Sequence, residues 1–327
     1  MFDRMNAKLT FVNSQTIARL VSRDSKHIIH LLDCGGSRSA KYRLRDAFRL
    51  DCSIPMPEFV RPFQSVRAPR VAVIDFDGTL SLIRSGWVEI MVGMMVDFLK
   101  PLPGTTESDA ELVDFVSNFV LNLNGRPTIF QMDFFVGTAR ARGGNPDSPD
   151  DYTAAFLEAL IGKAKQRIAS LESGEVTVDD LLVPGSRALL TDLKERGVQL
   201  TLASGTAVVD VRREAVLLGI AGFFEGRIFG PGENSREFSK MAVMRQMLAD
   251  NRTDGSELIG FGDGFVETAD VKELGGIAIG CATDEAHRSG RVEEWKRIRL
   301  IQAGADVIVP DYRNWHQLAE RLFPNPV

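Results

Sequence analysis

Histidine is scarce in this sequence, which has only four among its 327 residues. They are His27, His30, His287 and His316, and none stands in a motif typical of catalysis or metal binding. A Ser-His-Asp hydrolase and a zinc site built from histidines are therefore disfavoured. We expect any catalysis to depend on carboxylates, lysine, hydroxyl groups or a metal ion that prefers oxygen ligands.

Cysteine and long apolar runs are also scarce. The three cysteines, Cys34, Cys52 and Cys281, lack the spacing of a metal site or a disulfide framework, which fits a reducing compartment. The longest apolar run, residues 90–96, is far shorter than the ~20 residues of a membrane span. The first fifteen residues contain no apolar core of a signal peptide. These absences predict a cytoplasmic protein without a membrane segment.

The overall composition is that of an ordinary globular protein. Hydrophobic residues make up 44% of the chain and charged residues 25%, and the length suits about two or three domains. The net charge is −5, so no general excess of positive charge favours nucleic acid as a partner. We therefore expect a small-molecule partner and no nucleic acid.

Positive charge is concentrated at the N-terminal end. Residues 1–70 contain 13 Lys and Arg against 6 Asp and Glu, whereas residues 71–327 contain 26 against 38. The apolar spacing from Ser14 to Leu32 predicts an amphipathic helix, although the polar run Ser22–Lys26 interrupts it. A nucleic-acid-binding arm is possible here, but the interleaved acids favour a solvated or docking segment. We treat residues 1–67 as an extension outside the main fold.

The pattern changes from residue 70 onward, where short apolar runs alternate with helical segments of about ten residues. Such alternation predicts βαβ units and a parallel sheet covered by helices on both faces. The fold class is therefore α/β, with a Rossmann-like, doubly wound parallel sheet core and an inserted α-helical cap domain. We expect the core at residues 68–83 and 184–327, and the cap at residues 84–183. Expected strands are 71–74, 198–203, 227–229, 257–261, 277–279 and 306–309; expected helices in the core are 186–196, 207–218, 240–250, 266–274 and 315–322.

Polar motifs follow the predicted strands at their carboxyl ends. Asp75-Phe-Asp77-Gly-Thr79 follows the first strand, Ser204-Gly-Thr206 the second, and Gly-Asp263-Gly-Phe-Val-Glu267 a later one. Lys240 stands at the start of a predicted helix. Because active sites of open α/β sheets gather at these strand ends, we expect the motifs to form one site.

The spacing of the first motif suits phosphoryl transfer. Residues two apart on an extended segment point to one side, so Asp75 and Asp77 would share a site. One carboxylate could act as a nucleophile on phosphorus, and the other could protonate the leaving alkoxide and later activate water. A carboxylate beside a phosphate dianion costs several kcal/mol of repulsion unless a cation intervenes. Mg²⁺ prefers such oxygen ligands, and we expect it as the cofactor.

Together and in this order, the four motifs resemble those of the Mg²⁺-dependent phosphatases of the haloacid dehalogenase superfamily with a helical C1-type cap. The resemblance covers about residue 68 to the C-terminus. It implies that Asp75, the backbone carbonyl of Asp77, and Asp263 hold Mg²⁺. It further implies that Ser204 and Lys240 hold the transferring phosphoryl oxygens, that Thr79 and the Gly78 turn shape the phosphate loop, and that Gly205 offers a backbone N–H.

Two features depart from or extend that pattern. The family often has a second aspartate four residues after the first in its last motif, where this chain has Glu267, which could orient a metal-bound water. The segment around Arg126 resembles the substrate-specificity loop of the cap, and Arg126 or Arg84 could pair with a second anionic group. We therefore expect a small substrate resembling phosphoglycolate or a sugar phosphate.

The sequence thus predicts a Mg²⁺-dependent phosphomonoester hydrolase that forms an aspartyl-phosphate intermediate on a small phosphorylated metabolite. A phosphomutase of the β-phosphoglucomutase type is an alternative with the same motifs. A haloacid dehalogenase proper is disfavoured, because Asp77 would have no alkoxide to protonate. A non-catalytic binding or regulatory protein is disfavoured because the whole set of polar residues is present.

Overall fold

The computed structural model describes residues 17–20, 29–32, 56–61, 67–123, 128–232 and 238–323. The chain divides into two units, residues 1–51 and residues 52–327. The described residues of the first unit form the strands β1 (Ile17–Leu20) and β2 (Ile29–Leu32), which pair antiparallel with Ile17 opposite Leu32.

This strand pair corrects the helix predicted from Ser14 to Leu32. The polar run Ser22–Lys26, which interrupts the helical spacing, separates the two four-residue strands in the sequence. Two short apolar segments on either side of a polar run can pair with each other instead of continuing one helical face. The polar run that interrupts the apolar spacing is therefore the feature of this segment that indicates two strands and not one helix.

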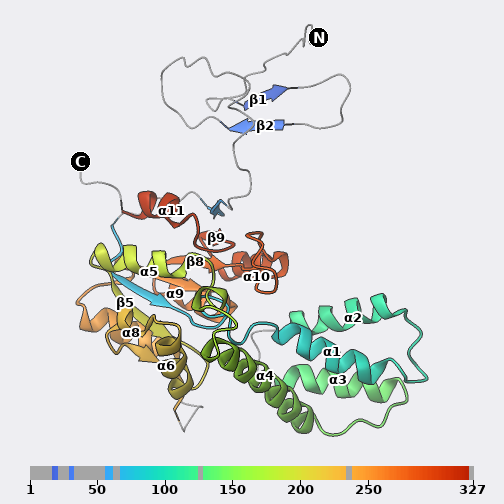
Figure 1. Ribbon diagram of the computed structural model, residues 1–327. Helices are drawn as coiled ribbons and strands as arrows, with labels where there is room; N and C mark the ends of the chain where they lie inside the picture. The colour runs from blue at the N-terminus through green and yellow to red at the C-terminus, as the bar shows by residue number, and fades with distance from the viewer. Residues whose placement is uncertain are drawn as a thin grey trace. The chain divides into compact units, whose positions relative to one another are not determined.

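The second unit is built on a seven-stranded sheet with the order β3-β9-β8-β7-β4-β5-β6 (Figure 1). All neighbouring strands are parallel except β3, which pairs antiparallel with β9 at one edge. The strands are β3 (Glu58–Phe59), β4 (Val71–Ile74), β5 (Gln199–Ala203), β6 (Ile228–Phe229), β7 (Leu258–Gly262), β8 (Ile277–Cys281) and β9 (Val307–Val309). This arrangement confirms the predicted α/β class with a Rossmann-like core. The edge strand β3 lies within residues 1–67, the segment expected to lie outside the fold.

The central strand β4 shows why the sheet is covered on both faces. All four of its residues are buried, and successive side chains point to opposite sides. Ala72 and Ile74 pack among α5, α6, α7 and α11, whereas Val71 and Val73 pack among α8 and α9, with α10 beside α9. These helices are α5 (Ser186–Glu195), α6 (Val208–Leu217), α7 (Ala221–Phe224), α8 (Lys240–Asp250), α9 (Phe265–Glu273), α10 (Glu294–Ala303) and α11 (Trp315–Leu322). Two short 3₁₀ helices are η2 (Val178–Asp180) and η4 (Gly255–Glu257).

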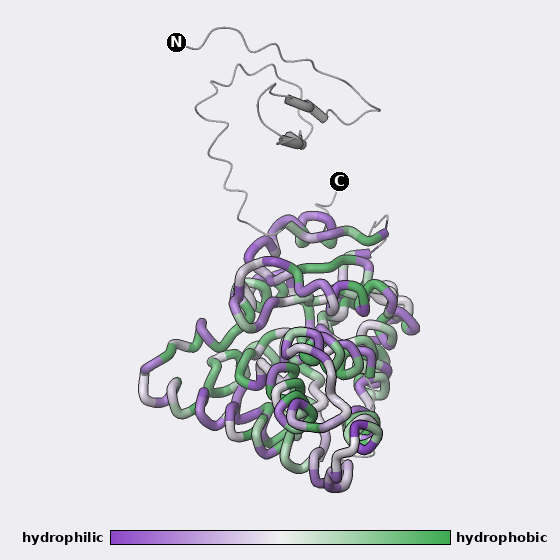
Figure 2. Tube along the Cα trace, turned by 90° about the vertical axis from the view of Figure 1, so that its right-hand side faces the viewer, coloured by the Kyte–Doolittle hydropathy of each residue, from purple (hydrophilic) through white to green (hydrophobic). Residues whose placement is uncertain are grey.

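Between β4 and β5, α5 packs on the sheet, and the four helices described before it form a bundle beside the sheet (Figure 1). They are α1 (Trp87–Leu99), α2 (Asp109–Asn122), α3 (Ile129–Ala141) and α4 (Pro149–Glu172). Ser108 and Ser148 begin α2 and α4 with capping boxes, which satisfy free backbone N–H groups at the helix starts. The bundle has its own hydrophobic core, whereas Ala164 and Ile168 of α4 belong to the core of the sheet. The helices that face the viewer in Figure 2 contain both hydrophobic and hydrophilic residues, as expected of helices that bury one face and expose the other.

The two chain segments that join the bundle to the sheet lie next to each other. Ser81 and Leu182 form an isolated antiparallel bridge, and the backbone N–H of Val183 donates to the carbonyl of Leu80. Arg167 of α4 donates to the carbonyl oxygens of Ile83 and Ser85, at 2.8 Å each. These contacts therefore fix the two segments that connect the bundle to the sheet near the carboxyl end of β4. None of the helices in the described part of the chain is long and apolar enough to cross a membrane.

Candidate active site

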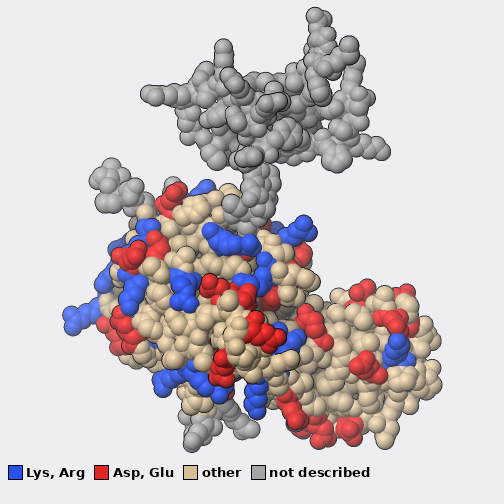
Figure 3. All heavy atoms as spheres, in the orientation of Figure 1, with Lys and Arg blue, Asp and Glu red and all other residues tan. Residues whose placement is uncertain are grey.

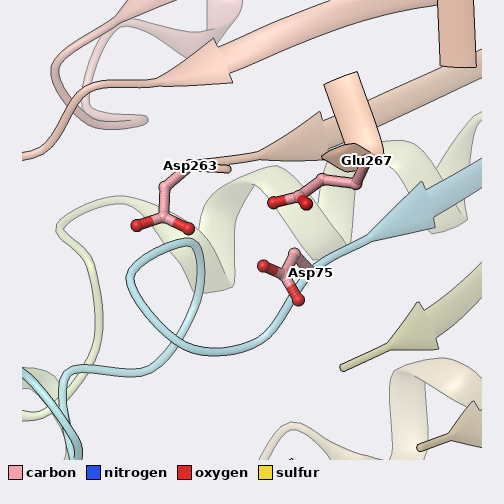
Figure 4. Close-up of side chains that lie close together, drawn as sticks. All are labelled: Asp75, Asp263 and Glu267. Atoms are coloured by element: carbon pink, nitrogen blue, oxygen red, sulfur yellow. The ribbon is translucent and has the colours of Figure 1, made fainter. Parts of the chain in front are cut away.

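Three carboxylates converge beyond the carboxyl ends of the central strands (Figure 4). Asp75 directly follows β4, Asp263 directly follows β7, and Glu267 lies in the first turn of α9. Each offers one oxygen atom within 4.8 Å of the others. Since β4 and β7 are hydrogen-bonded neighbours in the sheet, their ends bring these residues together from positions almost 190 apart in sequence.

The Gly-Asp-Gly motif makes room for Glu267 to fold back toward the strand end. A Cβ atom at Gly262 or Gly264 would lie 2.5 Å from the Glu267 side chain. The carboxylate of Glu267 accepts a 2.7 Å hydrogen bond from the backbone N–H of Gly264, which caps α9. Glu267 is therefore held at the helix start with its second oxygen directed at the other carboxylates.

Lys240 is the first residue of α8 and places its ammonium group between two of these carboxylates. Its Nζ lies 2.8 Å from Oδ1 of Asp75 and 3.5 Å from Oε2 of Glu267. Ser239 caps α8, since its hydroxyl accepts from the backbone N–H of Ala242. The cap fixes where the helix begins and hence where the lysine points.

Asp77 is held by hydroxyl groups. Its Oδ2 accepts a 2.7 Å hydrogen bond from Thr206 and a 3.4 Å one from Ser204. Its Oδ1 is buried and accepts no hydrogen bond within the described part of the chain. Gly78 follows at φ +71°, a conformation that favours glycine, so the chain turns sharply after Asp77.

Arg84 connects Asp77 to a buried acid. The guanidinium donates to both oxygens of Glu214 of α6, at 2.5 and 2.8 Å, and Nη1 lies 3.5 Å from Oδ1 of Asp77. The side chain of Glu214 is fully buried. Both Nη atoms of Arg84 are therefore bonded to Glu214, and Nη1 also forms an ion pair with Asp77.

A second buried lysine, Lys296 of α10, lies on the other side of the carboxylate cluster. Its Nζ donates a 2.7 Å hydrogen bond to Oδ2 of Asp263 and a second, short one to Oε1 of Glu285. Only 3% of its side chain is exposed. A Cβ atom at Gly78 would lie 2.3 Å from Oδ2 of Asp263, so the turn after Asp77 packs directly against this group.

These side chains line an open pocket of about 280 Å³. Its lining includes Asp75, Asp77, Gly78, Arg84, Trp87, Ser204, Gly205, Thr206, Lys240, Asp263, Glu267, Glu285 and Trp295. A second pocket of about 240 Å³ shares Trp87, Glu285 and Trp295 with the first and extends between α10 and the bundle. The rings of Trp87 and Trp295 meet edge to face at 6.3 Å, so the two pockets adjoin at this aromatic contact.

Burial and neighbouring charges shift the ionisation of the cluster in different directions. Burial raises the pKa of Asp75 well above its usual range, which Lys240 opposes, and burial raises the pKa of Asp263 to about 6 against the effect of Lys296. Burial also acts on Glu267, but Lys240 and the hydrogen bond at Gly264 outweigh it and lower the pKa. The carboxylates in turn hold the pKa of Lys240 and Lys296 above normal, despite burial. Both lysines therefore stay cationic at neutral pH.

The donor set and its charge suit a divalent cation. The three clustered groups offer only carboxylate oxygens, the ligand type that Mg²⁺ prefers. Four acids (Asp75, Asp263, Glu267 and Glu285) face two ammonium groups (Lys240 and Lys296), so the formal charge is −2 when every acid carries its full negative charge, as metal ligands do. One divalent cation would balance that charge, so the residues present fit a metal of this class.

The structure brings most of the predicted site residues to this one place. Ser204 and Gly205 line the pocket with Lys240. Thr79, which follows Gly78 of the lining in the sequence, is fully buried, and its Oγ1 has no hydrogen-bond partner among the described residues. Arg126 falls outside the described residues. Sequence reasoning did not single out Thr206, Glu285, Trp295 or Lys296. Thr206 adjoins Ser204 in the motif, whereas the other three carry no local signal and come from the region around α10.

The sheet, the strand-end carboxylates and the inserted bundle define an α/β protein with a Rossmann-like core and an acidic site at the ends of its central strands. The chain belongs to the haloacid dehalogenase-like hydrolase family, whose sequence pattern matches residues 69–269. The matched region contains Asp75, Asp77, Ser204, Lys240 and Asp263. No curated protein sequence matches the chain.

Solved structures of the same family are similar in fold. One is a conserved haloacid dehalogenase-like protein of unknown function from Agrobacterium tumefaciens, 12% identical, with a TM-score of 0.51 over 76% of this chain and 97% of that one. A predicted phosphoglycolate phosphatase from Haemophilus somnus is 14% identical, with a TM-score of 0.49 over 78% and 99% of the two chains. A family hydrolase from Deinococcus radiodurans with bound phosphate and sodium is 15% identical, with a TM-score of 0.49 over 80% and 99%. At these identities the comparison concerns the fold alone.

Proposed function

We propose that this protein is a Mg²⁺-dependent phosphomonoester hydrolase that forms an aspartyl-phosphate on Asp75. One observation supports the proposal most directly: a single pocket contains two aspartates that follow β4, a lysine, a serine and two further acids. These residues are Asp75, Asp77, Lys240, Ser204, Asp263 and Glu267. Asp75, the backbone carbonyl of Asp77, and Asp263 would hold Mg²⁺, with Glu267 beside them. Bound there, the cation would offset the repulsion between the nucleophile and the phosphate dianion.

The reaction would consist of two displacements at phosphorus, and different residues of the pocket would act in each. Lys240 lies 2.8 Å from Asp75 and opposes the rise in its pKa that burial causes, which favours the ionised carboxylate that attacks phosphorus. As the bond between Asp75 and phosphorus forms, the ester P–O bond breaks, and Asp77 gives a proton to the leaving alkoxide. Asp77 then takes a proton from the water that attacks phosphorus, and the bond to Asp75 breaks to release inorganic phosphate. Ser204 and Lys240 are the groups expected to bind the phosphoryl oxygens.

The second pocket bears on the substrate class. Its described lining contains four acids, Glu89, Asp284, Glu285 and Glu293, and one lysine that is already paired. A leaving group reaching past Trp87 and Trp295 would meet this acidic surface. On the face shown in Figure 3, acidic side chains lie with basic ones among them where the sheet meets the bundle. Such a lining favours a neutral, polyol-type leaving group, as in a sugar phosphate, over an acidic one. The bundle, predicted as a cap over residues 84–183, would cover that group and exclude water.

Hydrolysis of p-nitrophenyl phosphate with and without Mg²⁺ tests the proposal. The wild type should release nitrophenol only with the metal, and D75N should lower kcat by at least about 10³-fold, because the amide is a poor nucleophile. D97N, an Asp-to-Asn change at an exposed position of α1, is the matched control and should keep wild-type activity. Fluoroberyllate should attach to the Asp75 side chain of the wild type. Equal activity of D75N and wild type would refute the proposal.

The scattered cysteines also support a cytoplasmic location for this activity, since they show no disulfide framework.

A further inference from the structure

We propose that Lys296 is a positioning residue of the metal site, which acts by fixing the carboxylate of Asp263. This inference rests on the proposed function, because it assigns a role at the same site. It starts from one contact: the 2.7 Å hydrogen bond from Nζ of Lys296 to Oδ2 of Asp263. A ligand carboxylate held through one oxygen presents the other in a fixed direction.

The surroundings of Lys296 are those of a fixed group and not of a surface lysine. Its side chain is 3% exposed, against 55% for Lys100, which pairs with Asp109 on the surface of the bundle. Glu285 provides the second carboxylate at Nζ, so the ammonium bridges the loop after β7 and the loop after β8. Taking an ammonium group out of water is costly unless its hydrogen bonds are satisfied, and here two carboxylates satisfy them.

The neighbouring glycine turn adds a steric reason for the arrangement. Gly78 leaves the space in which Oδ2 of Asp263 lies, since a Cβ there would approach that oxygen to 2.3 Å and Oε1 of Glu285 to 3.0 Å. Lys296 therefore binds the same two oxygens against which the turn after Asp77 packs. The lysine holds Asp263 where the absence of a side chain at Gly78 leaves room for its carboxylate.

The two lysines divide the cluster between them. Lys240 pairs with Asp75 and Glu267, and Lys296 pairs with Asp263 and Glu285. Without Lys296, the adjacent carboxylates of Asp263 and Glu285 would repel each other and turn apart. Groups that hydrogen-bond to metal ligands typically change metal affinity by about 10- to 100-fold when they are removed.

The test is the affinity for Mg²⁺ alone, measured by isothermal titration calorimetry on the full chain. K296M keeps the length of the side chain but removes its donor, and its Kd for Mg²⁺ should rise by about 10- to 100-fold. K296Q, which keeps a neutral donor, should bind Mg²⁺ more tightly than K296M but more weakly than the wild type. It replaces K296M in the test if K296M does not fold. E285Q should bind within about threefold of the wild type, because Lys296 still holds Asp263.

K272M is the matched control, since it also removes a paired ammonium group. Nζ of Lys272 in α9 lies 2.8 Å from Oδ2 of Asp306, and neither residue lines the pocket. K272M should lower stability but leave the Mg²⁺ affinity unchanged. In steady-state assays, excess Mg²⁺ should restore most of the kcat of K296M, which a general loss of structure would not allow. Wild-type affinity in folded K296M, or an equal loss in K272M, would overturn the role of Lys296. A wild type that binds no Mg²⁺ would overturn the proposed function as well.

Discussion

Removing Arg84 should destabilise the protein strongly, because it would leave a buried carboxylate without its partner. Arg84 donates to both oxygens of Glu214, at 2.5 and 2.8 Å, and the Glu214 side chain has no exposed surface. Breaking a buried ion pair by removing one partner costs about 3–5 kcal/mol. At about 2 °C per kcal/mol for a domain of this size, R84M should lower Tm by about 6–10 °C.

Urea unfolding followed by circular dichroism provides the free energies, and two further variants test the reasoning. In R84M/E214L both charges are gone, so most of the lost stability should return, to within about 1 kcal/mol of the wild type. K100M removes one partner of a pair at 2.6 Å that is exposed, and it should cost less than about 1 kcal/mol. A loss in R84M no larger than in K100M, or no recovery in the double variant, would refute the account.

The pH dependence of the same variant has a definite sign. Burial raises the pKa of Glu214 above its normal value, and Arg84 opposes that rise. In R84M the opposition is gone, so the pKa of Glu214 in the folded state lies further above that of the unfolded chain than it does in the wild type. A folded state that binds more protons gains stability as the pH falls. The deficit of R84M relative to the wild type should therefore shrink between pH 7 and about pH 5.

Two more predictions concern the pocket. T206V removes the 2.7 Å hydrogen bond to Oδ2 of Asp77 and should lower kcat on p-nitrophenyl phosphate roughly tenfold, with little change in the Kd for Mg²⁺; an unchanged kcat would contradict it. On a panel of phosphate esters, neutral polyol leaving groups should have at least about tenfold higher kcat/KM than acidic ones, because Glu89, Asp284 and Glu293 surround the second pocket. A preference for phosphoglycolate would instead favour the predicted role of Arg126.

Much of the core could be predicted from the sequence because local signals and topology agree there. The continuous apolar run at Val71–Ile74 indicated a strand buried on both faces, and the polar motifs at strand ends indicated one site. Asp75, Ser204, Lys240 and Asp263 were predicted from these motifs, and the structure brings them to one pocket. Their individual roles stay predictions.

What the sequence did not reveal depends on contacts between distant segments. Lys296 lies in a helix that the pattern did not predict, and only the packing of α10 beside the strand ends brings it to Asp263. Arg84 carries no sign in the sequence that Glu214, 130 residues later, will engage it. The predicted N-terminal helix was wrong because short apolar segments fit two kinds of secondary structure.

The insertion of the bundle between β4 and β5 has a consequence for how the chain reaches this fold. Residues 75–198 separate the two paired strands, and closing an unstructured loop of that length costs about 4 kcal/mol of chain entropy. The bundle has a hydrophobic core of its own, and the bridge between Ser81 and Leu182 brings its two connections together. Early assembly of the bundle would therefore turn a long loop into a short one, and the central strands would meet sooner.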